Sequence, residues 1–435
     1  MKLAPYPEYK DSGVEWLGKV PSHWEVKPLV YCANFRTGKA HEPYIDDDGE
    51  FICVNSRFVS TEGATEKFCS KNITPAREGD ILMVMSDLPN GRALAKAYHV
   101  KFEKNLAVNQ RVCAISVVND KSRFLFFYLN RCPGLLIFDD GINQTHISND
   151  GFTKLPISLP PLPEQIAIAA YLDAATAKID ALMREQDELI ALLKEKRQAL
   201  ISHCVTKGLD PSAPLKDSGI EWLGKVPEHW VVTKFLRCTS FQEGPGLRHW
   251  QFTDDGVRVI CVTNITGLGI DFTEYSKFIS RDEYLNIYRH FKVNRGDLLL
   301  SSSGNSWGKI SKYENDEECI LNTSTIRVFE NSCSSMAQEF TKWILQSRTV
   351  RDQLELAMTG SCQPNFGPSH LAKLLVPLPP RSEQTAIAAF LDAETAKIDA
   401  LMEEAEAMIE RMCEHRSSLI SHVVTGKVRV MEVGQ

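Results

Sequence analysis

Residues 159–183 read LPPLPEQIAIAAYLDAATAKIDALM, and residues 378–402 read LPPRSEQTAIAAFLDAETAKIDALM. The two stretches differ at five of 25 positions and lie 219 residues apart. A second repeat precedes each of them: KDSGVEWLGKVPSHWEV at 10–26 recurs as KDSGIEWLGKVPEHWVV at 216–232, at an offset of 206. Internal repetition of this kind predicts two structurally related halves. Each half has a near-constant opening, a divergent middle and a near-constant tail.

Each near-constant tail is predicted to be a long helix. After Pro163 the first tail has neither Gly nor Pro until Gly208, and its apolar residues recur at spacings of three and four, as in a coiled coil. Antiparallel pairing would give both openings the same surroundings, which requires the two chain termini to approach one another. The predicted seam consists of Ile168, Leu172, Ile179, Leu182, Leu189, Leu193 and Leu200 in the first helix, and Ile387, Leu391, Ile398, Leu401, Met408, Met412 and Leu419 in the second.

The divergent middles are predicted to share one fold. Strand-like runs at 51–54, 81–85 and 112–118 recur at 257–262, 298–302 and 325–329, and helical stretches follow at 123–131 and 335–356. Short echoes also link them: Ile52-Cys53-Val54 resembles Ile260-Cys261-Val262, and Gly79-Asp80-Ile81-Leu82 resembles Gly296-Asp297-Leu298-Leu299. Because the offset grows from 206 to 219, the second middle carries about 13 extra residues in several insertions.

These observations predict an α+β fold with two mixed α/β globules. The two long helices join the globules as an antiparallel coiled coil, in a pseudo-twofold circular arrangement. The predicted divisions are an opening plus first globule at 1–158, a central helix at 159–208, a second opening plus globule at 209–374, a second helix at 375–426 and a tail at 427–435.

Composition limits the class of protein. The chain of 435 residues has 49 basic and 56 acidic side chains and a net charge of -7, but residues 27–155 and 233–374 carry nets of only +1 and 0. The acidic excess therefore lies in the openings and helices. No uncharged run is long enough for a membrane helix and the first residues lack a secretory signal, so a cytoplasmic location is expected. The twelve cysteines form no CxxC pair, which predicts reduced core thiols and no metal site.

The opening, the GDIL motif, the GxxQ pattern at Gly141 and Gln144 and at Gly360 and Gln363, and the LPP and EQ residues of both tails resemble the specificity (S) subunit of type I restriction-modification systems. The resemblance implies two target recognition domains, each recognising one half of a bipartite double-stranded DNA site, and helices that set the spacer. It also implies docking of two modification (methyltransferase) subunits, with restriction (translocase and nuclease) subunits in the full complex. S-adenosylmethionine, ATP and Mg would then belong to those partners. Arg381-Ser382 departs from Leu162-Pro163 of the first tail.

The chain shows no catalytic constellation of its own. Gln363-Pro364-Asn365-Phe366 has one proline too few for an amino-methyltransferase motif, and His23 and His229 have no visible catalytic partner. We therefore expect a non-catalytic subunit without a cofactor. A protein-binding scaffold, or a specificity module of another methyltransferase-based defence system, stays open as an alternative.

DNA recognition requires hydrogen-bonding side chains on loops, with Arg for guanine and Asn or Gln for adenine. Both middles supply such residues, and the ones that differ between the halves are the better candidates for base contacts. The candidates are Arg36, Lys39, Asn55, Arg57, Asn90, Arg92, Gln110, Arg111, Gln144 and His146 in the first middle, and Arg248, Asn264, Ser303, Asn305, Trp307, Lys309, Asn322, Gln363 and Asn365 in the second.

Overall fold

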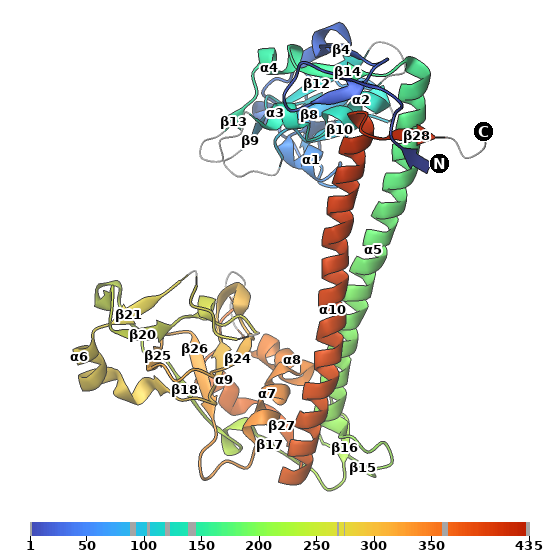
Figure 1. The fold of residues 1–435 in the computed structure, drawn as a ribbon. Helices are drawn as coiled ribbons and strands as arrows, with labels where there is room; N and C mark the ends of the chain where they lie inside the picture. Colours follow the sequence, from blue (N-terminus) through green and yellow to red (C-terminus); the bar gives the residue numbers. More distant parts are fainter. Residues whose placement is uncertain are drawn as a thin grey trace. The chain divides into compact units, whose positions relative to one another are not determined.

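The computed structural model describes residues 2–87, 93–101, 105–117, 122–137, 145–267, 269–273, 275–358 and 364–431 (Figure 1). The chain divides into two compact units. Unit 1 comprises residues 1–186 and 407–435, and unit 2 comprises residues 187–406. Both predicted long helices are present, α5 (Leu162–Lys207) and α10 (Arg381–Val424), and each contributes one part to each unit.

Unit 1 contains two main sheets. In the first, β12 lies between β5 and β8 and all strands are antiparallel, while in the second β6 pairs with β11 in parallel. The first sheet has the order β10 (Ala97–His99), β8 (Ile81–Val84), β12 (Val112–Val117) and β5 (Ala33–Thr37), and the second has β11 (Leu106–Val108), β6 (Phe51–Val54) and β7 (Phe68–Cys69). The short helices are α1 (Ser56–Ser60), α2 (Ser122–Leu129), α3 (Pro133–Leu136) and α4 (Asn149–Thr153).

Two-stranded ladders complete unit 1. They are β2 (Tyr9–Asp11) with β3 (Lys19–Pro21), β4 (Glu25–Pro28) with β14 (Pro156–Leu159), β9 (Ser86–Asp87) with β13 (Thr145–His146), and β1 (Lys2–Ala4) with β28 (Arg429–Met431). The last ladder pairs a segment near the start of the chain with one near its end, Lys2 opposite Met431 and Ala4 opposite Arg429. Figure 1 shows β28 beside the first residues of the described chain. The predicted approach of the termini is therefore confirmed.

Unit 2 repeats this arrangement with an enlarged second sheet. Its first sheet has the order β18 (Ser240–Glu243), β26 (Thr325–Phe329), β23 (Leu298–Ser301) and β24 (Ile310–Lys312). Its second has β19 (Phe252–Thr253), β21 (Lys277–Ile279), β20 (Val257–Ile260), β25 (Cys319–Leu321) and β22 (Lys292–Val293). The small ladders are β15 (Leu215–Asp217) with β16 (Lys225–Pro227) and β17 (Val231–Lys234) with β27 (Leu375–Leu378). The helices are α6 (Arg281–Glu283), α7 (Gln338–Gln346), α8 (Arg348–Ala357) and α9 (Pro368–Lys373).

The strand registers correct one sequence match. In β6, Val54 pairs in parallel with Val108, and in β20 Ile260 pairs in parallel with Leu321. Val54 therefore corresponds to Ile260, at the offset of 206. The predicted match of Ile52-Cys53-Val54 with Ile260-Cys261-Val262 is displaced by two residues from this structural equivalence. A shift of two residues keeps every side chain on the same face of a strand, so the apolar pattern could not reveal it.

The repeated opening and tail bind one another within each unit. In unit 1, Glu164 accepts hydrogen bonds from Tyr6 Oη at 2.5 Å and Trp24 Nε1 at 3.4 Å, and its Oε2 lies 2.9 Å from His23 Nε2. In unit 2, Glu383 accepts a hydrogen bond from Trp230 Nε1 at 2.9 Å and lies 2.6 Å from His229 Nε2. Both tryptophans are fully buried. The two histidines thus anchor the start of a helix, which is a structural role.

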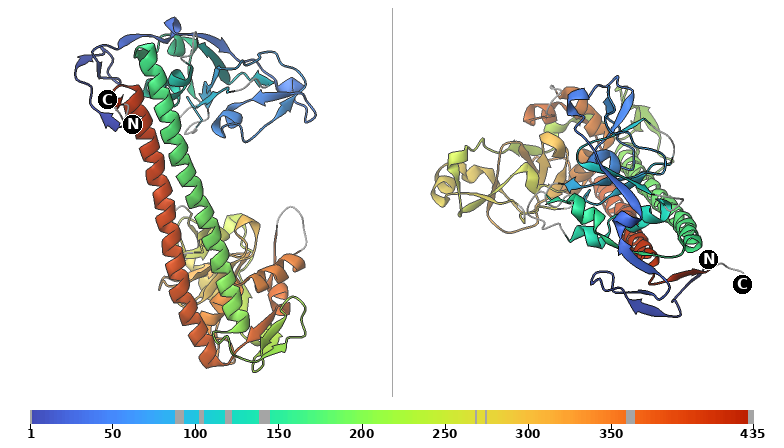
Figure 2. Two further views of the ribbon diagram at one scale, coloured as in Figure 1. Left: turned by 90° about the vertical axis from the view of Figure 1, so that its right-hand side faces the viewer. Right: turned by 90° about the horizontal axis from the view of Figure 1, so that it is seen from above.

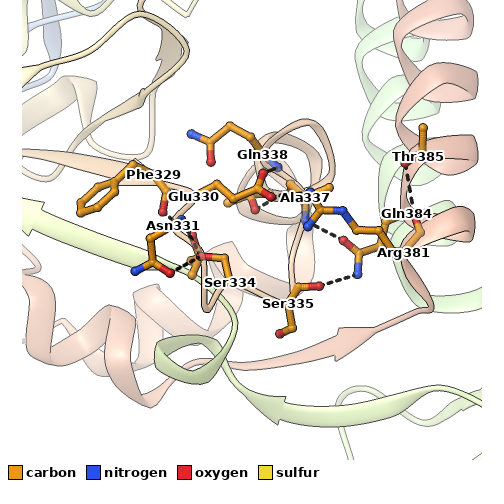
Figure 3. Close-up of polar contacts among 12 residues, drawn as sticks. Phe329, Glu330, Asn331, Ser334, Ser335, Ala337, Gln338, Arg381, Gln384 and Thr385 are labelled. Atoms are coloured by element: carbon orange, nitrogen blue, oxygen red, sulfur yellow. Dashed lines mark hydrogen bonds and ion pairs between the residues drawn. The ribbon is translucent and has the colours of Figure 1, made fainter.

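The glutamine of each EQ pair fastens the same helix start. Gln165 Nε2 donates to Pro160 O at 2.7 Å, and Gln384 Nε2 donates to Pro379 O at 2.9 Å. Figure 3 shows Gln384 between two further backbone groups: it donates to Ser335 O and accepts from Ala337 N, the residue before α7. Arg381, where the second tail departs from the first, forms an ion pair with Glu330.

Within each unit the parts of α5 and α10 lie side by side in all views (Figure 2). Their ends belong to the globule cores: Ile168, Leu172 and Leu419 pack in unit 1, and Ile387 and Leu391 pack in unit 2. Leu193 and Ile398 of the predicted seam are also buried, whereas Ile179, Leu200 and Met412 are half-buried.

Four predicted seam residues are instead exposed, namely Leu182, Leu189, Leu401 and Met408. The residues next to them are better covered: Ile190 and Ala405 are buried, and Met183, Met402 and Ile409 are half-buried. The predicted seam was therefore wrong in phase at alternate positions. A large aliphatic residue (Leu, Ile or Met) stands at both neighbouring positions, so spacing alone could not choose between them.

Nine of the described cysteines are buried free thiols, and Cys333 and Cys413 are exposed. Burial raises the pKa of the Cys53 and Cys204 thiols to about 11, which leaves them protonated at neutral pH. Within the described ranges, no helix is long and apolar enough to cross a membrane.

Candidate nucleic-acid interface

In unit 1, four chain segments meet at the turn between β11 and β12. Asn109 N donates to Val54 O at 3.1 Å, and Val112 N donates to Asn109 O at 2.9 Å, closing the turn. Gly38 N donates to Val112 O at 2.9 Å, and Met85 N donates to Arg111 O at 2.9 Å. We call this set of backbone bonds the turn frame of unit 1.

Unit 2 has the same turn frame between β25 and β26. Asn322 N donates to Ile260 O at 3.0 Å, and Thr325 N donates to Asn322 O at 3.2 Å. Gly244 N donates to Thr325 O at 3.0 Å, and Ser302 N donates to Ser324 O at 2.9 Å. All four bonds of unit 1 therefore recur, although the side chains on the turn change from Gln110 and Arg111 to Thr323 and Ser324.

A further segment lies against each turn frame. In unit 1, β9 pairs with β13, with His146 opposite Ser86, and Ile147 N donates to Met85 O at 2.8 Å. In unit 2, Asn365 forms a single antiparallel bridge with Ser303, and Phe366 N donates to Ser302 O at 3.0 Å. The loop that follows β8 or β23 is therefore bordered by equivalent backbone in both units.

The turn frames gather about half of the candidate side chains. The exposed candidates on or beside a frame are Lys39, Gln110, Arg111 and His146 in unit 1, and Asn305, Lys309 and Asn365 in unit 2, with Ser303 and Trp307 half-buried. Trp307 packs its ring edge against Phe366, with 6.3 Å between centroids, and the Arg351 guanidinium lies 4.8 Å from the Trp307 centroid. Arg57 and Arg248 are exposed on segments that continue from Val54 and Gly244.

Three candidate asparagines have structural positions instead. Asn55 caps α1 by accepting from Phe58 N at 2.9 Å, and Asn322 donates to Cys261 Sγ at 3.6 Å. Asn264 is buried, accepts from Cys261 N and donates to two backbone carbonyls at 2.8 Å. These amides are used inside the fold, so as base contacts they would first have to break an internal bond.

Arg36 likewise serves the buried acid of the GDIL motif. Its Nη2 lies 2.6 Å from Asp80 Oδ2, and Asp80 also accepts from Ser116 Oγ and Arg77 N. In unit 2, Asp297 takes the place of Asp80, with Arg327 Nη1 at 3.5 Å, and burial raises the pKa of Asp297. The motif therefore holds each first sheet together through a carboxylate and a guanidinium. The remaining candidates, Asn90, Arg92, Gln144 and Gln363, lie outside the described residues.

Sequence reasoning missed the glycine of each frame. Gly38 and Gly244 are an identical pair at the offset of 206, and Asn109 and Asn322 are an identical pair at 213. Identity at these positions inside otherwise divergent middles was the available signal. Within the described ranges, no group of three His, Cys, Asp or Glu side chains could hold a metal ion.

Comparisons with known proteins agree with one another. A family model described as "Type I restriction modification DNA specificity domain" matches residues 21–191 and 251–411. The MjaVIII type I restriction enzyme specificity subunit of Methanocaldococcus jannaschii is 25% identical over 421 residues, covering 95% of this chain and 94% of that protein. The EcoKI specificity subunit of Escherichia coli K12 is 23% identical and covers 94% of this chain and 90% of its own length. A solved structure of a type I R-M system chain superposes with a TM-score of 0.70 at 15% identity, covering 93% of this chain and 98% of that chain.

Proposed function

The chain belongs to the family of type I restriction-modification DNA specificity domains, and from this premise we propose that it selects the DNA sequence on which such a complex acts. Each globule would recognise one half of a bipartite site. The observation that carries the proposal is the pair of turn frames, which share their backbone bonds and differ in exposed side chains. Two different half-sites require such a constant frame with variable contacts.

We propose further that α5 and α10 pair as an antiparallel coiled coil that sets the spacer. Arg416 Nε lies 2.8 Å from Asp180 Oδ1 in unit 1, and Arg197 Nε lies 2.8 Å from Asp399 Oδ1 in unit 2. The two ion pairs are equivalent at the offset of 219, with donor and acceptor helices exchanged. This exchange supports an antiparallel arrangement, which would present the two globules to half-sites in opposed orientation.

We propose that the helices also bind protein partners. Leu182, Leu189 and Leu192 of α5 and Leu401 and Met408 of α10 are exposed large apolar side chains. Exposed apolar residues surrounded by charge are typical of interaction surfaces. We propose that two modification subunits dock here, and that restriction subunits join the full complex. Because the globules are nearly neutral, the partners would supply much of the attraction for phosphate.

In this proposal the chain has no active site of its own and works in the cytoplasm. S-adenosylmethionine would be bound by the modification subunits, and ATP and Mg by the restriction subunits. A scaffold that binds only proteins is the competing function. It accounts for the helices but gives no reason for two equivalent frames that carry different polar side chains.

The two functions are separated by DNA binding of the reconstituted complex. We would co-purify the chain with its modification subunits, measure binding to a random DNA library between 50 and 200 mM salt, and map the methylated adenines. We expect a bipartite site and an affinity that falls steeply with salt, by roughly 10³-fold or more if six or more phosphates are contacted. A scaffold would give no salt-dependent DNA binding.

A further inference from the structure

We infer that the turn at residues 109–111 determines the sequence specificity of unit 1, and that Gly38 is the residue that positions this turn. The inference rests on the proposed DNA-recognition function and adds to it the chemistry and the residues of one contact. The counterpart in unit 2 is the turn at residues 322–324, positioned by Gly244.

Glycine is required at position 38 because its backbone lies very close to the backbone of Val108 and Asn109. A Cβ at this position would lie 2.1 Å from Asn109 O and 2.7 Å from Val108 O, and one at Gly244 would lie 2.2 Å from Asn322 O. Neither glycine has a positive φ, so its role is to leave room rather than to adopt an unusual backbone conformation. Any side chain here would have to push the carbonyl of the turn away, and the turn with it.

The turn of unit 1 is held rigidly by its first residue. Asn109 is buried, and its Oδ1 accepts hydrogen bonds from Gln110 N at 2.7 Å and His41 N at 3.3 Å. Its Nδ2 donates to Glu42 Oε1 at 3.0 Å, which holds the pKa of Glu42 below its ordinary value. Backbone and side chain together therefore fix the direction in which the next two residues project.

Those two residues are free to bind a ligand. Gln110 and Arg111 are exposed, and neither side chain makes a hydrogen bond within the described part of the chain. Arg can bind guanine O6 and N7 with two hydrogen bonds, and Gln can bind adenine N6 and N7 in the same way. The equivalent Thr323 and Ser324 are short and offer one hydroxyl each. The turn of unit 1 therefore fits a purine edge that the turn of unit 2 could not reach.

The direct test replaces the two side chains and keeps the turn. We would compare the Q110T/R111S chain with the wild type, each in complex with the modification subunits, by library selection and methylation mapping. We expect about 10- to 100-fold weaker discrimination at one or two base pairs of a single half-site, with the other half-site unchanged. Both residues are exposed, so the variant should fold as the wild type does.

Two outcomes would overturn the inference. The first is an unchanged site and affinity. The second is weaker binding that is uniform across sequences and has a shallower salt dependence, which would make Arg111 a phosphate contact only. If the wild-type complex itself binds no DNA, the proposed function fails and the inference fails with it, whereas either outcome above in a wild-type complex that binds DNA overturns the inference alone.

The positioning role of Gly38 has a matched control in the same unit. A Cβ at Gly49 would lie 2.4 Å from the Cys69 carbonyl carbon, so G49A creates a similar backbone clash away from the turn frame. We expect G38A and G49A to lower the melting temperature comparably, but only G38A to reduce base discrimination at the half-site of unit 1. Equal discrimination in both variants at equal stability would show that Gly38 serves the fold alone.

Discussion

The two globules agree in their strands and differ in the segments between them. The offset between equivalent residues is 206 at β6 and β20 and 217 at β8 and β23, so unit 2 gains eleven residues between these strands. At the next strands, β10 and β24, the offset between equivalent residues is 213. The loop at 85–96 in unit 1 is therefore four residues longer than the equivalent loop at 302–309 in unit 2.

The difference shows which parts of the fold are interchangeable. Strand pairing, the turn frame and the binding of Trp24 or Trp230 to a glutamate are common to both units. The loop beside the frame and the side chains on the turn are not. One frame can therefore carry different contact surfaces. Variants at a feature that the two units share, or at one that separates them, test this comparison.

The largest effect is expected at the helix anchors. Glu164 accepts hydrogen bonds from the buried Tyr6 and Trp24 and contacts His23. Within the described residues, the Glu383 side chain hydrogen-bonds with Trp230 and His229 only. We expect E164A to lower the free energy of unfolding by roughly 2–4 kcal/mol and E383A by about 1–3 kcal/mol, because more buried donors lose their acceptor in unit 1. Urea unfolding measures both, with E164Q and E383Q as controls that keep an acceptor. An E383A cost equal to or above that of E164A would contradict the comparison.

The second effect separates the units by pH. Burial and the nearby Arg123 guanidinium lower the pKa of His99 to about 4, with a contribution from Lys101, while Asp173 opposes the shift. The equivalent residue in unit 2 is Lys312, which is exposed. The pKa of His99 is lower in the folded chain than its ordinary 6.5, so protonation favours unfolding: stability is full above about pH 6.5 and falls as the pH drops toward 4.

Between pH 7 and pH 5 we therefore expect unit 1 to lose about 1 kcal/mol that unit 2 keeps, after allowance for partial exposure. Hydrogen exchange of β10 amides against β24 amides would measure the two units in one sample. The H99Q variant should remove the difference. If hydrogen exchange of the β10 amides depends on pH in the same way in the wild type and in H99Q, His99 is not the cause of the pH-dependent loss of stability.

The smallest effect is expected at the ion pairs between the helices. Asp180 with Arg416 and Arg197 with Asp399 are equivalent pairs of similar partial exposure. Double-mutant cycles with D180N and R416Q, and with R197Q and D399N, should give equal coupling energies of about 0.5 kcal/mol, falling with salt. Coupling in one cycle alone would show that the two ends of the helix pair are not equivalent.

Most of the architecture followed from repetition and pattern. The strand runs at 51–54 and 325–329 match β6 and β26, and the long helices and the approach of the termini were expected. The helical stretch at 335–356 divides into α7 and α8 because Ser347 caps the second helix by accepting from Val350 N. A cap of this kind leaves the spacing of apolar residues unchanged, so a continuous amphipathic pattern does not reveal where one helix ends and the next begins.

Three features depended on geometry that residue types do not encode. At alternate positions of the helix seam the covered residue lies one place after the predicted one, because neighbours such as Leu182 and Met183 are both large and apolar. The structural equivalence of β6 and β20 differs by two residues from the one predicted from sequence, and a shift of two preserves which side chains face inward. Gly38 has its role only because a segment distant in sequence comes within van der Waals contact of it. Each case is decided by a contact across the fold.

The proposal that each globule recognises one half-site is tested most directly by giving both units the same globule. Residues 27–155 would replace residues 233–374, with one junction within the equivalent strands β4 and β17 and the other just before their partners β14 and β27. Methylated adenines of the reconstituted complex would then be mapped. We expect the half-site of unit 1 to appear twice in opposed orientation, with the wild-type spacer. A site identical to that of the wild type, or loss of the bipartite pattern in a folded complex, would contradict the assignment of one half-site to each globule.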